Sequence, residues 1–100
     1  MSCPFTISVD IPTPETGDLA VRIAGLDVQA WYAAPDEKHG ELGGWRWLVR
    51  VDMMSPLRVL HGTWQIERGD AVDRRDAIRQ ARIHAYPRIE EALRQVGRAT

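Results

Sequence analysis

The sequence predicts an α+β fold in which an antiparallel sheet of four to five strands packs on one long C-terminal helix. Two observations support this prediction. Before residue 70, apolar side chains alternate with polar ones along several short segments, which is the period of a strand with one buried face. After residue 73, apolar side chains recur at helical spacing and form a single stripe.

Five segments show strand patterns, and we expect strands at about 4–11, 19–24, 26–33, 44–52 and 57–67. The first ends at Pro12, because proline cannot donate a hydrogen bond to a sheet. The clearest alternation is in 44–52, where Trp45 and Trp47 share the face expected to be buried. Residues 15–24 also fit a short helix capped by Asp18, so the choice between helix and strand stays open there.

The segment 57–67 is expected to return beside the tryptophan-rich strand, with Leu60, Gly62, Trp64 and Ile66 facing inward. Gly62 then leaves room for an indole ring or marks a bulge. Residues 34–44 combine charged residues with glycine and lack periodicity, which predicts a hairpin loop.

The C-terminal helix is expected at about 73–97. Asp73 can cap its N-terminus, and Asp76 follows three residues later, where a carboxylate favours the positive end of the helix dipole. The apolar positions fall within an arc of about 80° at 100° per residue. They are Ile78, Ala81, Ala85, Ile89, Ala92 and Val96.

Pro87 lies inside this helix, where it removes one helical hydrogen bond and crowds the preceding turn. It points about 160° away from the apolar stripe, which continues in phase on both sides. We therefore expect one helix, kinked at Pro87, with the proline on its solvent face.

Composition indicates a single domain over residues 1–100. The chain has 44% hydrophobic and 27% charged residues, which is typical of a globular protein. Cys3 is the sole cysteine, so no intramolecular disulfide can form. No apolar run is long enough to span a membrane, and the N-terminus lacks the pattern of an export signal. We expect a cytoplasmic protein without a membrane partner. Arginine outnumbers lysine twelve to one and asparagine is absent, which suggests a gene rich in G+C from a bacterium or its phage.

No residue pattern indicates chemistry. The three histidines, His39, His61 and His84, lack the spacing of zinc ligands, and no nucleophile elbow or phosphate-binding loop occurs. We expect no catalytic residue, no metal and no cofactor, and therefore not an enzyme.

Two surfaces remain as candidates for partner binding. The negative net charge hides a basic end, since residues 73–100 hold seven arginines and four acidic residues. On the helix, Arg75, Arg79 and Arg82 form a stripe that Tyr86 continues. It can serve as a solubilising rim or can bind carboxylates or phosphates. On the sheet, strand phase sends Trp31 to the face opposite the core, with Arg46 and Arg50. Such a face is either solvated or a contact surface.

A W-x-W strand (Trp45, Trp47), a return strand with Gly62, and a capped helix with Ala77, Ala81 and Ala85 form one pattern over about residues 43–96. This pattern resembles short phage and mobile-element proteins, including anti-CRISPR proteins, and it also resembles antitoxin-like and double-stranded-RNA-binding-like βββα folds. The resemblance to anti-CRISPR proteins implies a compact inhibitor that covers a surface of a larger host protein complex.

Three functions follow as hypotheses. The first is a non-catalytic binding protein of the anti-CRISPR type that contacts a host protein complex stoichiometrically. The second is a nucleic-acid-binding regulator that uses the arginine stripe; its affinity would fall steeply with salt. The third is a small structural protein that forms a homodimer through the second face of the sheet.

Overall fold

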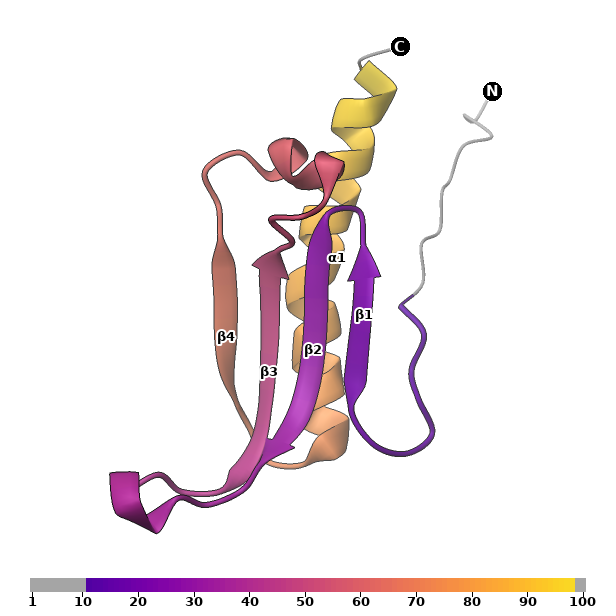
Figure 1. The fold of residues 1–100 in the computed structure, drawn as a ribbon. Helices are drawn as coiled ribbons and strands as arrows, with labels where there is room; N and C mark the ends of the chain where they lie inside the picture. The colour runs from indigo at the N-terminus through magenta and orange to yellow at the C-terminus, as the bar shows by residue number, and fades with distance from the viewer. Residues whose placement is uncertain (1–10, 99–100) are drawn as a thin grey trace.

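The computed structural model describes residues 11–98, which form an α+β fold of two layers, a four-stranded antiparallel sheet and one long helix covering one of its faces (Figure 1). The strands lie side by side in chain order: β1 (Leu19–Ile23), β2 (Leu26–Ala33), β3 (Gly44–Val51) and β4 (Ile66–Ala71). The helix is α1 (Arg74–Arg98). Two short 3-10 helices, η1 (Glu37–His39) and η2 (Pro56–His61), lie in the connections. The predicted fold class is confirmed.

The first two described strands form a tight hairpin. Residues 15–24 contain β1 and no helix, which decides between the two possibilities that the sequence leaves open. The turn consists of Ala24 and Gly25, with φ of 50° and 79°. Two consecutive positive φ values match the right-handed twist of the flanking strands, so this turn joins them directly.

The core lies between the sheet and α1. Val28 pairs with Val49 across β2 and β3, and Ala30 pairs with Trp47, so these side chains point to the same face. The helix presents alanines to them, and their small side chains let its backbone approach the sheet closely. Every residue of this set is at most 6% exposed, including Ala77, Ala81, Ala85 and Ile89.

The predicted strand 57–67 is wrong. Residues Pro56–His61 form η2, and the fourth strand is Ile66–Ala71. Ser55 starts the 3-10 helix by accepting a hydrogen bond from the Leu57 amide at 3.1 Å, with Pro56 in the first turn. Gly62, at a φ of 59°, ends it. The inward positions of β4 are polar or small, so the apolar alternation that predicts strands is missing from this one.

Gly69 makes the room for an indole that we expected from Gly62. It lies opposite Trp47 in the β3–β4 pairing, and a Cβ atom there would lie 2.9 Å from Trp47 Nε1. A Cβ on Gly62 would meet nothing within 4 Å. The prediction that a glycine accommodates a tryptophan therefore identified the right kind of contact at the wrong residue.

The predicted strand at 4–11 lies outside the described residues except for Ile11, which is part of no strand. Ile11 is 1% exposed and belongs to the core. Its amide donates a hydrogen bond to Tyr86 Oη at 3.2 Å. The chain therefore meets α1 before it turns into β1.

The helix begins as predicted. Asp73 Oδ1 accepts a hydrogen bond from the Asp76 amide at 2.8 Å, and the Asp76 side chain accepts one from the Val72 amide at 3.1 Å. The helix is continuous through Pro87, which is exposed as its phase predicts. The kink at Pro87 stays a prediction. Val96, expected in the buried stripe, is 44% exposed because α1 extends past the sheet (Figure 1).

Within residues 11–98, no helix combines the length and apolar character needed to cross a membrane.

Candidate functional site

The structure brings the four helix residues predicted to bind a partner into one groove. This arginine groove runs along α1 beside the segment that precedes β1 and has a volume of about 530 Å³. Ile83, which is 52% exposed, supplies its aliphatic surface, and guanidinium groups lie around it; Ile78 also borders the groove but belongs to the core. The groove is lined by Thr13, Arg74, Arg75, Ile78, Arg79, Arg82, Ile83 and Tyr86.

Two hydrogen-bonded anchors hold the wall of the groove that Thr13 belongs to. Arg74 donates from Nε to the carbonyl of Gly17 at 2.8 Å and from Nη2 to the carbonyl of Pro14. Tyr86 Oη accepts the hydrogen bond from the Ile11 amide. Thr13 lies between these anchors in the chain, so the groove has a fixed wall rather than a free loop.

The arginines of the groove differ in how far they are neutralised. Arg79 Nη2 donates to Asp76 Oδ1 at 2.8 Å, and this hydrogen bond is the main reason why the pKa of Asp76 lies below its ordinary value. Arg82 donates to Tyr86 Oη at 3.2–3.3 Å, and its guanidinium lies over the tyrosine ring. Arg75 is exposed, and its side chain has no hydrogen bond or ion pair to any of the described residues.

Trp31, Arg46 and Arg50 lie on the sheet face that α1 leaves uncovered. Trp31 pairs directly with Arg46 across β2 and β3, as strand phase predicts. Arg46 also lies 3.8 Å from Asp70 and donates to the Leu42 carbonyl at 3.3 Å. Its charge is therefore partly neutralised within the sheet.

Arg50 has a structural role on the same face. Its Nε and Nη2 atoms each lie 3.0 Å from Oδ2 of Asp27, which is 7% exposed. Gln29 donates to the same oxygen at 3.0 Å. A buried carboxylate needs such partners, so Arg50 stabilises the pairing of β2 with β3 by neutralising Asp27.

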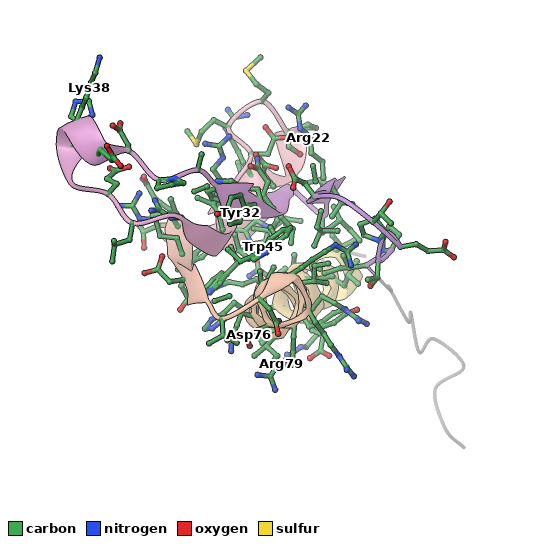
Figure 2. All side chains as sticks on the ribbon, turned by 90° about the horizontal axis from the view of Figure 1, so that it is seen from below. Arg22, Tyr32, Lys38, Trp45, Asp76 and Arg79 are labelled. Atoms are coloured by element: carbon green, nitrogen blue, oxygen red, sulfur yellow. The ribbon has the colours of Figure 1, made fainter. Side chains whose placement is uncertain are left out.

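The two predicted sets of binding residues therefore form separate surfaces. Figure 2 shows Arg79 on the helix side of the molecule and Arg22 on the opposite side of the sheet. The sheet lies between the arginine groove and the face of Trp31, so one compact ligand cannot contact both. Of the two surfaces, the groove has the larger unneutralised positive charge.

Sequence reasoning missed four lining residues of the groove: Thr13, Arg74, Ile83 and Ile78, the last predicted only as part of the buried stripe. Arg74 and Ile83 have sequence signals, since each lies within a turn of the arginine stripe. Thr13 has no sequence signal, because its position depends on how the segment before β1 packs against α1.

No group of three or more histidine, cysteine, aspartate or glutamate side chains within residues 11–98 is arranged to hold a metal ion. The groove offers guanidinium groups, a phenol and aliphatic surface, and guanidinium groups bind carboxylates and phosphates. Comparison of the chain with models of known protein families, with curated proteins and with solved structures finds no match.

Proposed function

We propose that this chain is a non-catalytic binding protein that makes stoichiometric contact with a host protein complex through the arginine groove. One observation supports this proposal above the others. The groove combines aliphatic surface from Ile83, which is 52% exposed, with a rim of arginines, and the Arg75 side chain in that rim has no partner among residues 11–98.

Charge complementarity defines the segment that fits the groove. Guanidinium groups hold carboxylates in a planar, bidentate geometry, and the aliphatic surface excludes water around the contact. The matching ligand is a protein segment in which an aliphatic side chain is flanked by aspartate or glutamate. Such a segment places a carboxylate on Arg75 and its apolar side chain against Ile83.

The resemblance to anti-CRISPR proteins supplies the class of action. A domain of this size, encoded by a phage or mobile element, inhibits by covering a surface of a larger complex. The role needs no reacting group on the small protein, only a stable and complementary surface.

The nucleic-acid alternative uses the same arginines. Phosphate binding requires a run of positive charge, whereas Asp73 and Asp76 lie at the start of this helix and Asp76 already pairs with Arg79. The aliphatic part of the groove is also unsuited to a phosphate backbone. A protein ligand therefore explains the groove better.

Affinity capture with matched variants tests the proposal. The immobilised wild-type protein, Arg75→Glu and Arg68→Glu are each incubated with lysate of the bacterium that carries the gene, and bound proteins are quantified by mass spectrometry. Arg68 is the matched control because it is also exposed and without a partner among residues 11–98, but lies on β4 away from the groove.

We expect the wild-type protein and Arg68→Glu to capture one discrete protein that Arg75→Glu does not capture. When purified, this captured protein should bind the wild-type chain at one-to-one stoichiometry. Equal capture by all three proteins would reject the groove. A steep loss of DNA or RNA binding with salt in a gel-shift assay would favour the regulator instead. A concentration-dependent dimer in sedimentation, disrupted by Arg68→Glu, would favour the structural protein.

A further inference from the structure

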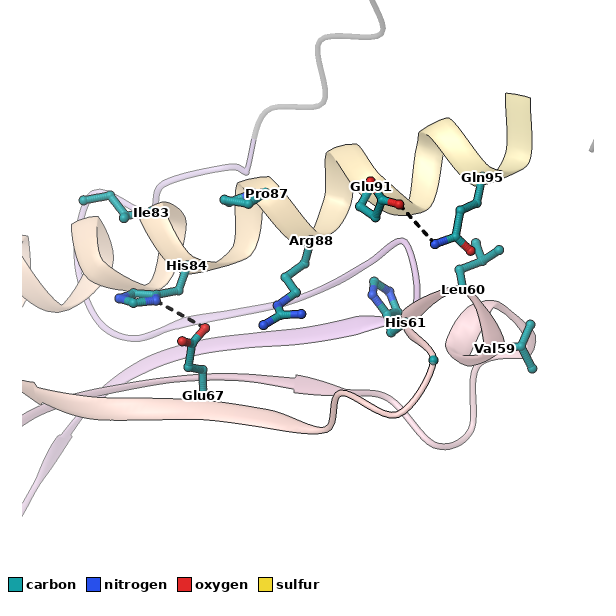
Figure 3. A pocket seen from close by; sticks show the side chains of 11 residues that line it. Val59, Leu60, His61, Glu67, Ile83, His84, Pro87, Arg88, Glu91 and Gln95 are labelled. Carbon is teal, nitrogen blue, oxygen red and sulfur yellow. Dashed lines mark hydrogen bonds and ion pairs between the residues drawn. The ribbon is translucent and has the colours of Figure 1, made fainter. Parts of the chain in front are cut away.

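A second concavity lies on the other side of α1, between the helix, η2 and β4. It has a volume of about 380 Å³, within the range of small-molecule sites. Figure 3 shows Arg88 and His84 projecting from the helix toward the strands, with His61 entering from η2. We call it the Arg88 pocket; the side chains relevant here are His61, Glu67, Ile83, His84, Arg88 and Glu91.

Arg88 is the unneutralised cation of this pocket. Its guanidinium carbon lies over the Trp64 ring, 4.0 Å from the ring centroid, a cation–π contact. A guanidinium has five N–H donors, and this contact with the ring pairs none of them with an acceptor. Arg88 makes no hydrogen bond or ion pair with the described residues.

The two carboxylates of the pocket already have partners. Glu67 Oε2 lies 3.3 Å from Nδ1 of His84, and the imidazole of His84 is stacked on Trp47. Glu91 lies 3.5 Å from Arg94 Nη1 and accepts from Gln95 Nε2 at 3.5 Å. Neither carboxylate forms an ion pair with Arg88, so the N–H groups of this guanidinium are not taken up by Glu67 or Glu91.

The other residues that line the pocket determine which chemical group can be attached to the anion. His61 Nε2 lies 2.7 Å from the Ala24 carbonyl, and because a carbonyl only accepts, this nitrogen carries the proton. That bond fixes the ring in the pocket wall. Leu60, Ile83 and Pro87 add apolar surface. An oxyanion at Arg88 would thus have an aromatic and aliphatic neighbourhood around it.

We propose that the Arg88 pocket binds a small organic oxyanion, a carboxylate or phosphate attached to a compact apolar or ring-shaped group. The guanidinium of Arg88 takes the anionic oxygens, and Trp64 holds the guanidinium in place. The rest of the ligand lies against His61 and the apolar wall. This site shares only Ile83 with the arginine groove and does not depend on the function proposed for that groove.

Nuclear magnetic resonance titrations test this proposal with benzoate and inorganic phosphate as probes and sodium chloride at matched ionic strength as reference. Benzoate has a ring beside its carboxylate, and phosphate has none. The wild-type protein is compared with Arg88→Gln and with Arg68→Gln. Arg68 is a matched control because it is exposed, does not line the pocket and has no side-chain partner among residues 11–98.

We expect saturable shifts at the Arg88 Nε–H and Trp64 indole signals, with a higher affinity for benzoate than for phosphate. The affinity for benzoate should fall by about tenfold or more in Arg88→Gln but not in Arg68→Gln. Shifts that match those in sodium chloride, or that persist in Arg88→Gln, overturn the site. If Arg88→Gln does not fold, measurements on the wild-type protein alone test the proposal. A rise of Tm with benzoate and saturable shifts confined to the pocket support the proposal; neither effect at tens of millimolar rejects it.

Discussion

The indole ring of Trp47 occupies the space that a side chain at position 69 would need. Gly69 lies opposite Trp47 in the β3–β4 pairing, and a Cβ atom there would lie 2.9–3.0 Å from three atoms of the ring. The ring cannot move away freely, because it is 6% exposed and stacks on His84 with a centroid separation of 4.3 Å.

Gly69→Ala is therefore expected to destabilise the protein by about 1–3 kcal/mol, the usual cost of overpacking a filled core. Urea unfolding gives the free energy of unfolding directly. Gly44→Ala is the matched control, since a Cβ there would meet nothing within 4 Å, and its effect should stay within about 0.5 kcal/mol. Equal effects of the two substitutions would contradict the packing described for Trp47.

The same contact explains which part of the sheet could be predicted. In β2 and β3, apolar side chains face the helix at every second position, so alternation locates both strands and their phase. In β4 the inward positions include Glu67, which pairs with His84, and Gly69, which makes room for Trp47. Tertiary contacts select these residues, and a pattern of hydrophobicity cannot reveal them.

Tyr86→Phe tests the anchor between α1 and the segment before β1. Tyr86 Oη accepts from the Ile11 amide at 3.2 Å, and Ile11 is 1% exposed, so the variant leaves a buried donor without that partner. We expect a loss of about 1–2 kcal/mol in the free energy of unfolding and faster hydrogen exchange at the Ile11 amide. Tyr32→Phe, at a tyrosine that is 54% exposed, should change stability by less than about 0.5 kcal/mol. An unchanged exchange rate at Ile11 would refute the anchor.

Arg50→Ala distinguishes a structural role from a binding role on the open face of the sheet. The substitution removes both contacts of Arg50 with the buried carboxylate of Asp27 and should cost about 1–3 kcal/mol in thermal or urea unfolding. Arg22→Ala is the comparison, because its side chain is 76% exposed and lies 3.8 Å from Asp52, a contact of less than about 1 kcal/mol. If both variants lose the same small amount, Asp27 does not depend on Arg50.

The Asp76 carboxylate predicts a change of stability in acid. Hydrogen bonds from Arg79 and from the Val72 amide lower the pKa of Asp76 in the folded state, so the unfolded chain binds its proton more tightly. This contribution is present above the unfolded pKa and disappears as the pH falls through the folded one. Asp76→Asn should therefore be less stable than wild type at neutral pH, and the difference should shrink below about pH 4.

Denaturant unfolding across this pH range measures the effect of Asp76→Asn. Glu90→Gln removes a carboxylate from an exposed position of the same helix and is the control for net charge. A gap between wild type and Asp76→Asn that stays constant into acid would show that the carboxylate is not stabilised by its partners.

The candidate surfaces were only partly predictable. Helical spacing places Arg75, Arg79 and Arg82 on one stripe without knowledge of the fold. The groove beside them also needs Thr13, which the Arg74 and Tyr86 anchors hold in place from a distant part of the chain. Likewise, strand phase predicts the face of Arg50 but not its bond to Asp27, because the register between two strands is set by the whole sheet.

Calorimetric titration of the captured partner into Arg75→Glu and into Arg68→Glu tests most directly whether the arginine groove is the contact surface. Both substitutions change the net charge equally, so long-range electrostatics affects them alike. We predict one-to-one binding to Arg68→Glu with wild-type affinity, and binding to Arg75→Glu weakened by about tenfold or more. Wild-type affinity in Arg75→Glu together with weakened binding in Arg68→Glu would contradict the proposal and move the contact to the open face of the sheet.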